Sequence, residues 1–364
     1  MARVDLHHIT KRFRRHVALD DFSLEIADGE FFVLLGPTGA GKTTTLRLIA
    51  GLDTPDSGSI MIGGQDVGAW SAAQRDVALV FQYYSLYPHY TVRQNLEFPL
   101  RSKHRRMSAG EISHRVAQAA QTLRIEHLLE RKTDRLSGGE MQRVSIGRAI
   151  VRQPRVFLMD EPLSNLDAKL RELLRAELKD LQMKLGATFL YVTHDQVEAM
   201  SMGDQIGVLD HGRIVQVGTP HQIYNQPRDT FVATFVGSPA MNLLSGSIRD
   251  GSLVVEPGRL EIAMRGALAG VESDRLTVGV RSEDVAVGPG GDLEGQVYAV
   301  ENHGVEQIVT LKVAEHLVKA TIPAHMAIEV DRMVPFTFNA KKLQLFDAQT
   351  GVRLGTAPEE GRHG

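Results

Sequence analysis

A glycine-rich segment between an apolar run and a helical pattern constrains the fold of this chain more than any other feature. The run Phe31-Phe32-Val33-Leu34-Leu35 predicts a buried strand, and it is followed directly by Gly36-Pro37-Thr38-Gly39-Ala40-Gly41-Lys42-Thr43. This order matches G-x-x-x-x-G-K-[ST], in which backbone N–H groups surround phosphate oxygens at the start of a helix. We therefore expect a nucleotide site that runs from Gly36 to Thr44, with Lys42 on the β- and γ-phosphates and Thr43 on Mg²⁺.

Three more apolar runs have the length of buried strands, and each ends at a polar residue. The runs are Val77–Phe81, Val156–Met159 and Thr188–Thr193, and they lead into Gln82, Asp160-Glu161 and His194. Because ligands of open α/β sheets bind beyond the carboxyl ends of the strands, we expect these side chains at one edge. Over about 235 residues the alternation of such runs with amphipathic stretches predicts an α/β fold with a largely parallel sheet.

The two adjacent acids that follow Val156–Met159 are expected to have different roles. Burying a carboxylate costs free energy unless it is paired or lies near a cation. We expect Asp160 to bind Mg²⁺ and Glu161 to polarise the water that attacks ATP. Positioned general bases contribute about 10²–10⁴-fold to a rate.

The segment Leu136-Ser137-Gly138-Gly139-Glu140 has two compatible interpretations. Ser137 and Glu140 have the spacing of a capping box, which begins many ordinary helices. A helix that begins Ser-Gly-Gly also exposes backbone N–H groups, a hydroxyl and the positive end of the helix dipole to an approaching phosphate. Met141-Gln142-Arg143 follows the segment and favours the second interpretation.

With these motifs in order, the first 236 residues resemble the ABC ATPases. The motifs are Phe13, the phosphate loop, Gln82, the segment 136–140, Asp160-Glu161, Ser164-Asn165-Leu166-Asp167 and His194. The resemblance implies a P-loop NTPase-type core with a helical subdomain at about 86–153. It also implies that Phe13 stacks on adenine, that Gln82 contacts Mg²⁺ and the water, and that His194 contacts the γ-phosphate. By themselves, Gln82 and His194 are more often ordinary structural residues.

The resemblance also implies a dimer, either of two identical chains or with a paralogous ATPase. The segment Ser137-Gly138-Gly139-Glu140 of one subunit, with Asp167, would then close on the γ-phosphate held by Lys42 of the other. Two positions depart from the commoner family pattern. Phe13 stands where Tyr is commoner, which keeps an aromatic face, and Glu140 stands where Gln is frequent.

After Gly237 the chain changes to short β-prone runs separated by Gly, Asp and Pro, which predicts a small all-β, barrel-like domain over 237–356. Residues 357–364 are expected to be a disordered tail. The segment Gly212–Pro220 resembles importer ATPases with a C-terminal β-domain, and Phe235–Asn242 resembles the maltose and multiple-sugar branch in particular. That branch implies a regulatory second domain and import of a sugar or sugar-like solute. Importers of polyamines, sulfate, iron or glycerol phosphate share this layout and stay open as alternatives.

Composition limits the partners. The chain has 41 basic and 44 acidic side chains, a formal net charge of −3 and no cysteine. The charge gives no support to nucleic-acid binding, and thiolate metal sites are excluded. Without an apolar stretch of about 20 residues, we expect the chain to reach the cytoplasmic face of a membrane only through partners.

Four of the seven tyrosines lie within Tyr83–Tyr90, where local packing and partner docking are both open interpretations. In the family this region receives two integral-membrane permease subunits, and an extracytoplasmic solute-binding protein acts through them. Two rival functions remain. Non-transport ABC ATPases usually carry coiled-coil insertions or a second ATPase domain, and metabolic P-loop kinases lack the 136–140 segment.

Overall fold

The computed structural model describes residues 2–102, 107–250, 252–256, 260–263 and 273–356. The chain forms two compact units, Met1–Pro220 and His221–Gly364. Residues 221–236 thus pack with the second unit, whereas the domain boundary at 236/237 stays a prediction. The expected tail 357–364 lies outside the described residues.

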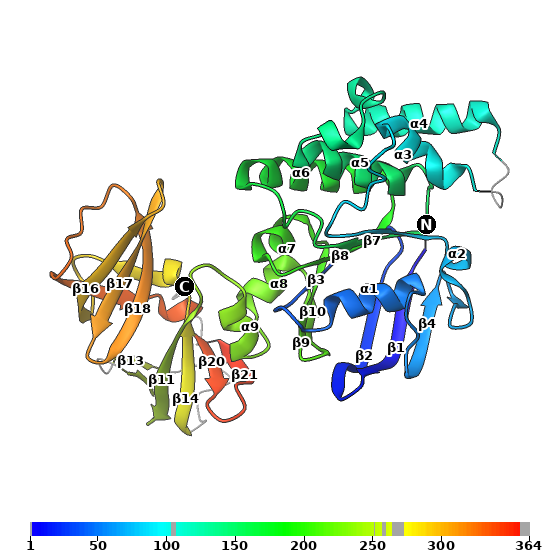
Figure 1. Ribbon diagram of the computed structural model, residues 1–364. Helices are drawn as coiled ribbons and strands as arrows, with labels where there is room; N and C mark the ends of the chain where they lie inside the picture. Colours follow the sequence, from blue (N-terminus) through cyan, green and yellow to red (C-terminus); the bar gives the residue numbers. More distant parts are fainter. Residues whose placement is uncertain (1, 103–106, 251, 257–259, 264–272, 357–364) are drawn as a thin grey trace, which may run out of the picture. The chain divides into compact units, whose positions relative to one another are not determined.

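A six-stranded sheet forms the centre of the first unit and confirms the predicted α/β class (Figure 1). Its strands β9, β3, β8, β7 and β6 are parallel neighbours, and β10 pairs with β9 in the antiparallel sense. The bounds, in sheet order, are β10 (Arg213–Gly218), β9 (Gln205–Asp210), β3 (Phe31–Leu35), β8 (Thr188–Thr193), β7 (Val156–Asp160) and β6 (Val77–Val80). The predicted runs at Phe31–Leu35 and Thr188–Thr193 are strands with the same bounds.

A second sheet at the N-terminus was not predicted. It is antiparallel and consists of β2 (His16–Ile26), β1 (Val4–Phe13), β4 (Ser57–Ile62) and β5 (Gln65–Asp66). Register shifts interrupt the pairing of β1 with β2, and His8 and Asp21 have positive φ angles of 51°. These irregularities break the two-residue alternation by which a half-buried strand is identified in a sequence.

One apolar core joins the antiparallel sheet, α1 and the central sheet. Val4, Phe22, Leu46, Leu48 and Leu158 belong to it, and they come from four separate segments of the chain. Figure 1 shows α1 (Lys42–Ala50) beside β1 and β2, directly after the phosphate loop. Because α1 is held on its apolar side by this core, its first residue has a fixed position.

The remaining helices of the first unit are α2 (Ala72–Arg75), α3 (Val92–Glu97), α4 (Ala109–Leu123), α5 (Gly138–Ile150), α6 (Ala168–Leu185) and α7 (Gln196–Met202). Leucines at helical spacing over Ala168–Leu185, followed by Gly186, predict a helix from the sequence. Helix α6 has these bounds and ends at Gly186, whose φ of 58° is left-handed. Helices α3, α4 and α5 pack on one another between positions 92 and 150.

The second unit begins with α8 (Pro220–Asn225) and α9 (Thr230–Phe235) and continues as two antiparallel sheets. One sheet consists of β13 (Leu260–Ala263), β12 (Ser252–Val255), β11 (Asn242–Arg249), β14 (Ser273–Val280), β20 (Gln344–Asp347) and β21 (Arg353–Thr356). The other consists of β15 (Val285–Val287), β19 (Met333–Phe338), β16 (Leu293–Asn302), β17 (Glu306–Val313) and β18 (His316–Pro323). The two sheets share one apolar core, which confirms the predicted barrel-like β domain. Among the described residues, no helix combines the length and apolarity that crossing a membrane requires.

Candidate functional site

The phosphate loop leaves the central strand β3 at Gly36 and enters α1 at Lys42. Gly39 and Gly41 have left-handed φ angles of 82° and 113°, which side chains rarely adopt. A Cβ on Gly41 would lie 2.6 Å from the carbonyl oxygen of Ala18, and one on Gly36 would lie 2.4 Å from that of Leu209. The glycines therefore allow both the turn and the close approach of neighbouring backbone.

Lys42 lies at the centre of this loop. Its side chain is buried, and Nζ donates hydrogen bonds to the carbonyl oxygens of Gly36 (2.9 Å) and Pro37 (3.1 Å). The same atom lies 3.5 Å from Oε1 of Glu161. The ammonium group thus faces both the loop that would hold phosphates and the acid that ends β7.

Thr43 and Asp160 provide two neighbouring oxygen atoms in the site. The Thr43 hydroxyl donates a 3.0 Å hydrogen bond to Oδ1 of Asp160. Burial raises the pKa of Asp160, and the Thr43 hydrogen bond partly opposes this shift. Mg²⁺ is bound in proteins by one or two carboxylates together with other oxygen ligands, so these two residues fit that ion. No group of three or more His, Cys, Asp or Glu side chains suited to a metal occurs in the described part of the chain.

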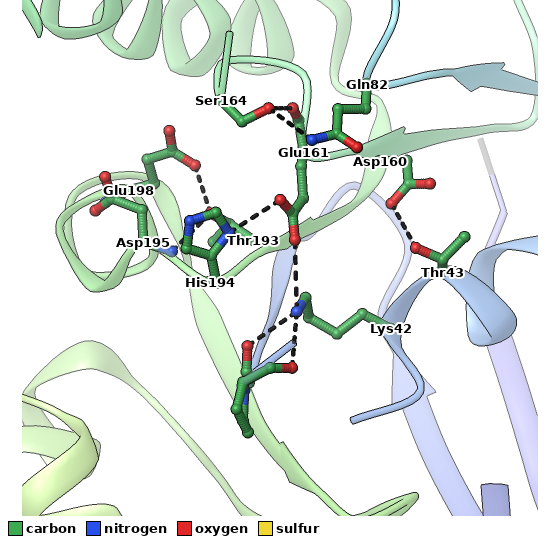
Figure 2. A network of polar contacts seen from close by, with 12 residues as sticks. Lys42, Thr43, Gln82, Asp160, Glu161, Ser164, Thr193, His194, Asp195 and Glu198 are labelled. Carbon is green, nitrogen blue, oxygen red and sulfur yellow. Dashed lines mark hydrogen bonds and ion pairs between the residues drawn. The ribbon is translucent and has the colours of Figure 1, made fainter. Parts of the chain in front are cut away.

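Glu161 has an unusual backbone and two side-chain partners. Its φ is 43°, in the left-handed region that non-glycine residues seldom occupy, and such strain clusters at functional sites. Its N–H donates to the carbonyl oxygen of Val192 (3.1 Å). Figure 2 shows the side chain between Lys42 and His194, whose Nδ1 lies 2.9 Å from Oε2 of Glu161. Three separate segments therefore converge on one carboxylate.

Gln82 is linked to Glu161 through Ser164. The amide Nε2 of Gln82 donates to Oγ of Ser164 (3.2 Å), and that hydroxyl donates to the carbonyl oxygen of Glu161 (2.9 Å). The side chain of Asn165 also donates to the carbonyl oxygen of Gln82 (3.0 Å). The role of Ser164 as a bridge between these two residues was not predicted.

A cleft of about 530 Å³ joins the predicted nucleotide residues. It is lined by Phe13, His16, Ala18, Thr38, Gly39, Gly41, Lys42, Thr43, Thr44, Gln82, Asp160, Glu161 and His194. Phe13 ends β1 and has 44% of its surface exposed, and the Lys11 ammonium group lies over its ring, 5.2 Å from the centroid. His16 and Ala18 were not predicted. They follow Phe13 on β2, and the unrecognised hairpin is the reason that they were missed.

The segment from Ser137 to Glu140 does not line this cleft, and neither does Asp167, among the described residues. Ser137 caps α5 and forms a full capping box with Glu140, as the first interpretation requires. Ser137 is exposed, whereas a Cβ on the buried Gly139 would lie 2.5 Å from a methyl group of Leu170. Gly139 thus allows close packing of α5 on α6. Asp167 is the N-cap of α6.

The tyrosine segment combines packing with exposure. The rings of Tyr87 and Phe98 lie 4.4 Å apart, and Tyr90 lies 5.4 Å from Tyr87. The Arg148 guanidinium of α5 lies over the Tyr87 ring at 4.9 Å. Tyr83, in contrast, has 74% of its surface exposed. Local packing therefore applies to Tyr87 and Tyr90, and partner docking stays a prediction for the exposed Tyr83.

Two families match the chain. Residues 19–164 match the family described as ABC transporter, and residues 237–285 match the MalK OB fold domain. The xylose/arabinose import ATP-binding protein of Haloferax volcanii is 45% identical, over 100% of this chain and 97% of its own length. The sn-glycerol-3-phosphate import ATP-binding protein of Ruegeria pomeroyi is 44% identical, over 97% and 99%. The trehalose/maltose import ATP-binding protein of Thermococcus litoralis is 45% identical, over 97% and 100%.

Solved structures share the first unit's fold. A dimeric post-hydrolysis state of an ATP-binding cassette bound to ADP and Pi aligns with a TM-score of 0.53 and 32% identity. The alignment covers 60% of this chain and 98% of that one.

Proposed function

The chain belongs to the ATP-binding subunits of ABC importers, and from this premise we propose that it hydrolyses ATP as a dimer to drive uptake of a sugar or sugar-like solute. The observation that carries the proposal is the contact of Glu161 with both Lys42 and His194 inside the cleft. Strand ends that deliver an acid, a cation and an imidazole to a phosphate loop suit phosphoryl transfer to water.

In this proposal the phosphate loop and Lys42 hold the β- and γ-phosphates, and Phe13 stacks on adenine. Thr43, Asp160 and Gln82 would hold Mg²⁺, which supplies positive charge next to the phosphate oxygens. The water oxygen bonds to the γ-phosphorus while Glu161 takes a proton from that water. The bond from the γ-phosphorus to the bridging oxygen breaks, and this oxygen leaves with ADP. His194, held by Glu161, donates toward a γ-phosphate oxygen. ADP and phosphate are the products.

We propose a dimer because Ser137, Gly138 and Gly139 do not line the cleft of their own chain. Gly138 and Gly139 begin α5 with N–H groups and no side chains, and Ser137 there is exposed. Because these residues do not line their own cleft, they are available to the γ-phosphate of a second subunit. Asp167, the exposed N-cap of α6, would lie beside them in that closed dimer.

Membrane partners are proposed to dock near Tyr83–Tyr90. The exposed Tyr83 adjoins Phe81, of which 41% is exposed, and Phe81 lines a groove with Leu52, Leu79 and Pro99. Exposed aromatic and aliphatic side chains beside a groove are typical of interaction surfaces. Two permease subunits would thereby hold the dimer on the cytoplasmic face of the membrane, and a solute-binding protein would act on the other side.

Sugar import is the best-supported solute class. Relatives named for xylose and arabinose and for trehalose and maltose are 45% identical to the chain, and one named for glycerol 3-phosphate is 44% identical. That near-equality makes glycerol phosphate the second candidate. Uptake assays with the permease and binding-protein partners in vesicles, across sugars, polyols and their phosphates, separate the two.

Glu161→Gln tests the proposed reaction directly. The amide keeps the size of the side chain but is a far weaker base, so turnover should fall by at least about 100-fold. Binding of ATP should persist, because the phosphate loop is unchanged, and the variant should accumulate as a closed dimer with ATP. Glu315→Gln, an exposed carboxylate on the second unit, serves as the charge-matched control. Hydrolysis by Glu161→Gln near the wild-type rate would show that another group activates the water.

A further inference from the structure

A buried carboxylate lies behind the strand end that carries His194. Glu198, in the first turn of α7, is 2% exposed. Its Oε2 accepts hydrogen bonds from the hydroxyl groups of Thr193 (2.6 Å) and Tyr191 (2.9 Å). The two donors are themselves buried residues of β8. Figure 2 shows Glu198 on one side of His194 and Glu161 on the other.

The Thr193 hydroxyl relays this contact to the other side of His194. While it donates to Glu198, it accepts a 2.9 Å hydrogen bond from the backbone N–H of Asp195. The residues before and after His194 are therefore both tied to one carboxylate. The His194 side chain itself is 54% exposed, so its backbone and its contact with Glu161 set the direction of the ring.

The same strand end fixes the two other parts of the site. The carbonyl oxygen of Thr193 accepts from the N–H of Gly36 (3.4 Å), and that of Val192 accepts from Glu161 (3.1 Å). A shift of this strand end would change the distance from His194 to Glu161 and would disturb the start of the phosphate loop. Displacements of about 1 Å at reacting groups can cost about 100-fold in rate.

This buried carboxylate is not needed to begin α7. Burial raises the pKa of Glu198, and the hydrogen bonds from Thr193 and Tyr191 partly oppose this shift. Asp195 already caps the helix, with Oδ1 accepting from the N–H groups of Val197 and Glu198. An apolar side chain would avoid burying a carboxylate but would leave the buried hydroxyl groups of Thr193 and Tyr191 without this acceptor. What the carboxylate adds is a strong acceptor for two converging hydroxyl groups.

We propose that Glu198 is a positioning residue for ATP hydrolysis, which holds the backbone on both sides of His194 through Thr193 and so keeps the imidazole against Glu161. This inference rests on the proposed function, because it assumes that His194 and Glu161 act in the reaction.

The experiment compares Glu198→Ala, Glu198→Gln and His194→Ala, alone and combined, by steady-state ATP hydrolysis of the full-length dimer. Glu198→Ala should lower kcat about tenfold and leave the KM for ATP within about twofold, because Lys42 and Thr43 are untouched. Glu198→Gln keeps an acceptor oxygen and should recover most of the rate. In the His194→Ala background, Glu198→Ala should cause no further loss beyond about twofold, since it acts through the missing imidazole.

Each other outcome counts against the proposal. A kcat for Glu198→Ala within about twofold of wild type overturns it, and so do losses that multiply in the double variant. If Glu198→Ala does not fold, Thr193→Val removes the relaying hydroxyl at nearly equal volume, and Thr193→Ser restores it. Glu315→Gln is again the control. Absence of ATP hydrolysis by the wild-type protein would instead contradict the proposed function, so the two failures are distinguishable.

Discussion

Asp160 shows how a single residue can favour function over stability. Its raised pKa means that the fold holds on to the proton more tightly than the unfolded chain does. Stability therefore falls as pH rises from the ordinary aspartate pKa, about 3.9, toward the raised value, because the unfolded chain loses its proton first. An ionised carboxylate that costs stability at this position is consistent with a ligand for a cation.

Asp160→Asn should separate the effect of this carboxylate on stability from its role as a ligand for a cation. The amide oxygen can still accept from Thr43, and no buried charge remains, so Tm should stay unchanged or rise. The magnesium-dependent ATPase rate should fall about 100-fold or more, because a charged oxygen ligand is lost. The measurement is hydrolysis across a magnesium titration, with thermal unfolding beside it. Asp180→Asn breaks only an exposed ion pair with Lys184 and serves as the control. An unchanged magnesium dependence would remove Asp160 from the proposed metal site.

At the scale of elements, the contact of α5 with α6 depends on Gly139. An added Cβ would lie 2.5 Å from a methyl group of Leu170, and overpacking of this kind costs about 1–3 kcal/mol. Gly139→Ala should therefore lower the free energy of unfolding by about that amount, and Leu170→Ala should relieve part of the clash. Gly110→Ala in α4 is the matched control, because its added Cβ would lie no closer than 4.0 Å to any described atom outside the adjacent residues and the helix backbone. Denaturant unfolding of wild type, the three single variants and the Gly139→Ala/Leu170→Ala double variant tests this prediction, and equal stability of the two Gly→Ala variants would contradict it.

Two helices with the same capping box distinguish capping from catalysis. Ser108 and Glu111 begin α4 as Ser137 and Glu140 begin α5. Either Ser→Ala change should cost about 0.5–2 kcal/mol of stability. Only Ser137→Ala should also lower ATP hydrolysis, because Ser137 is proposed to meet a phosphate. Equal activity of the two variants would leave Ser137 as a cap alone.

The pH dependence of this box follows from its hydrogen bonds. Ser137 donates to the Glu140 carboxylate from its backbone and hydroxyl, which lowers the pKa of Glu140. The contribution of the box to stability is thus complete above the ordinary glutamate pKa, about 4.3, and is lost as pH falls through the lowered value. The difference in stability between wild type and Ser137→Ala should shrink over that range.

The elements that sequence patterns predicted are those with regular spacing. Uninterrupted apolar runs identified β3 and β8, and helical spacing with a terminal glycine identified α6. Because parallel strands end at one edge, the meeting of Glu161 with His194 could also be expected. The bulged hairpin of β1 and β2, with positive φ at His8, has no such period and was missed. Glu198 was missed for another reason: within a short helix its spacing is that of an ordinary polar residue.

At the scale of the whole molecule, the two units differ in how much of their function follows from geometry. The first unit brings Phe13, the phosphate loop and Glu161 to one cleft, so its chemistry can be argued from distances. The second unit is two antiparallel sheets around one core, with Arg281 donating to the carbonyl oxygens of Ala233, Val236 and Tyr224. These bonds tie α8 and α9 to the sheets, which explains why residues 221–236 pack with the β domain.

Mixed dimers test the claim that each ATP is held by two subunits. Lys42→Ala damages the phosphate loop, and Ser137→Ala damages the opposite half of the composite site. A dimer with one subunit of each kind has one site with both defects and one with neither. Random mixing of equal amounts makes about half of the dimers mixed, so about a quarter of the sites should be intact. The mixture should therefore hydrolyse ATP faster than either variant alone, and dilution that separates the subunits should abolish the gain. If both halves of the site came from the same chain, every site would carry one defect and mixing would add nothing.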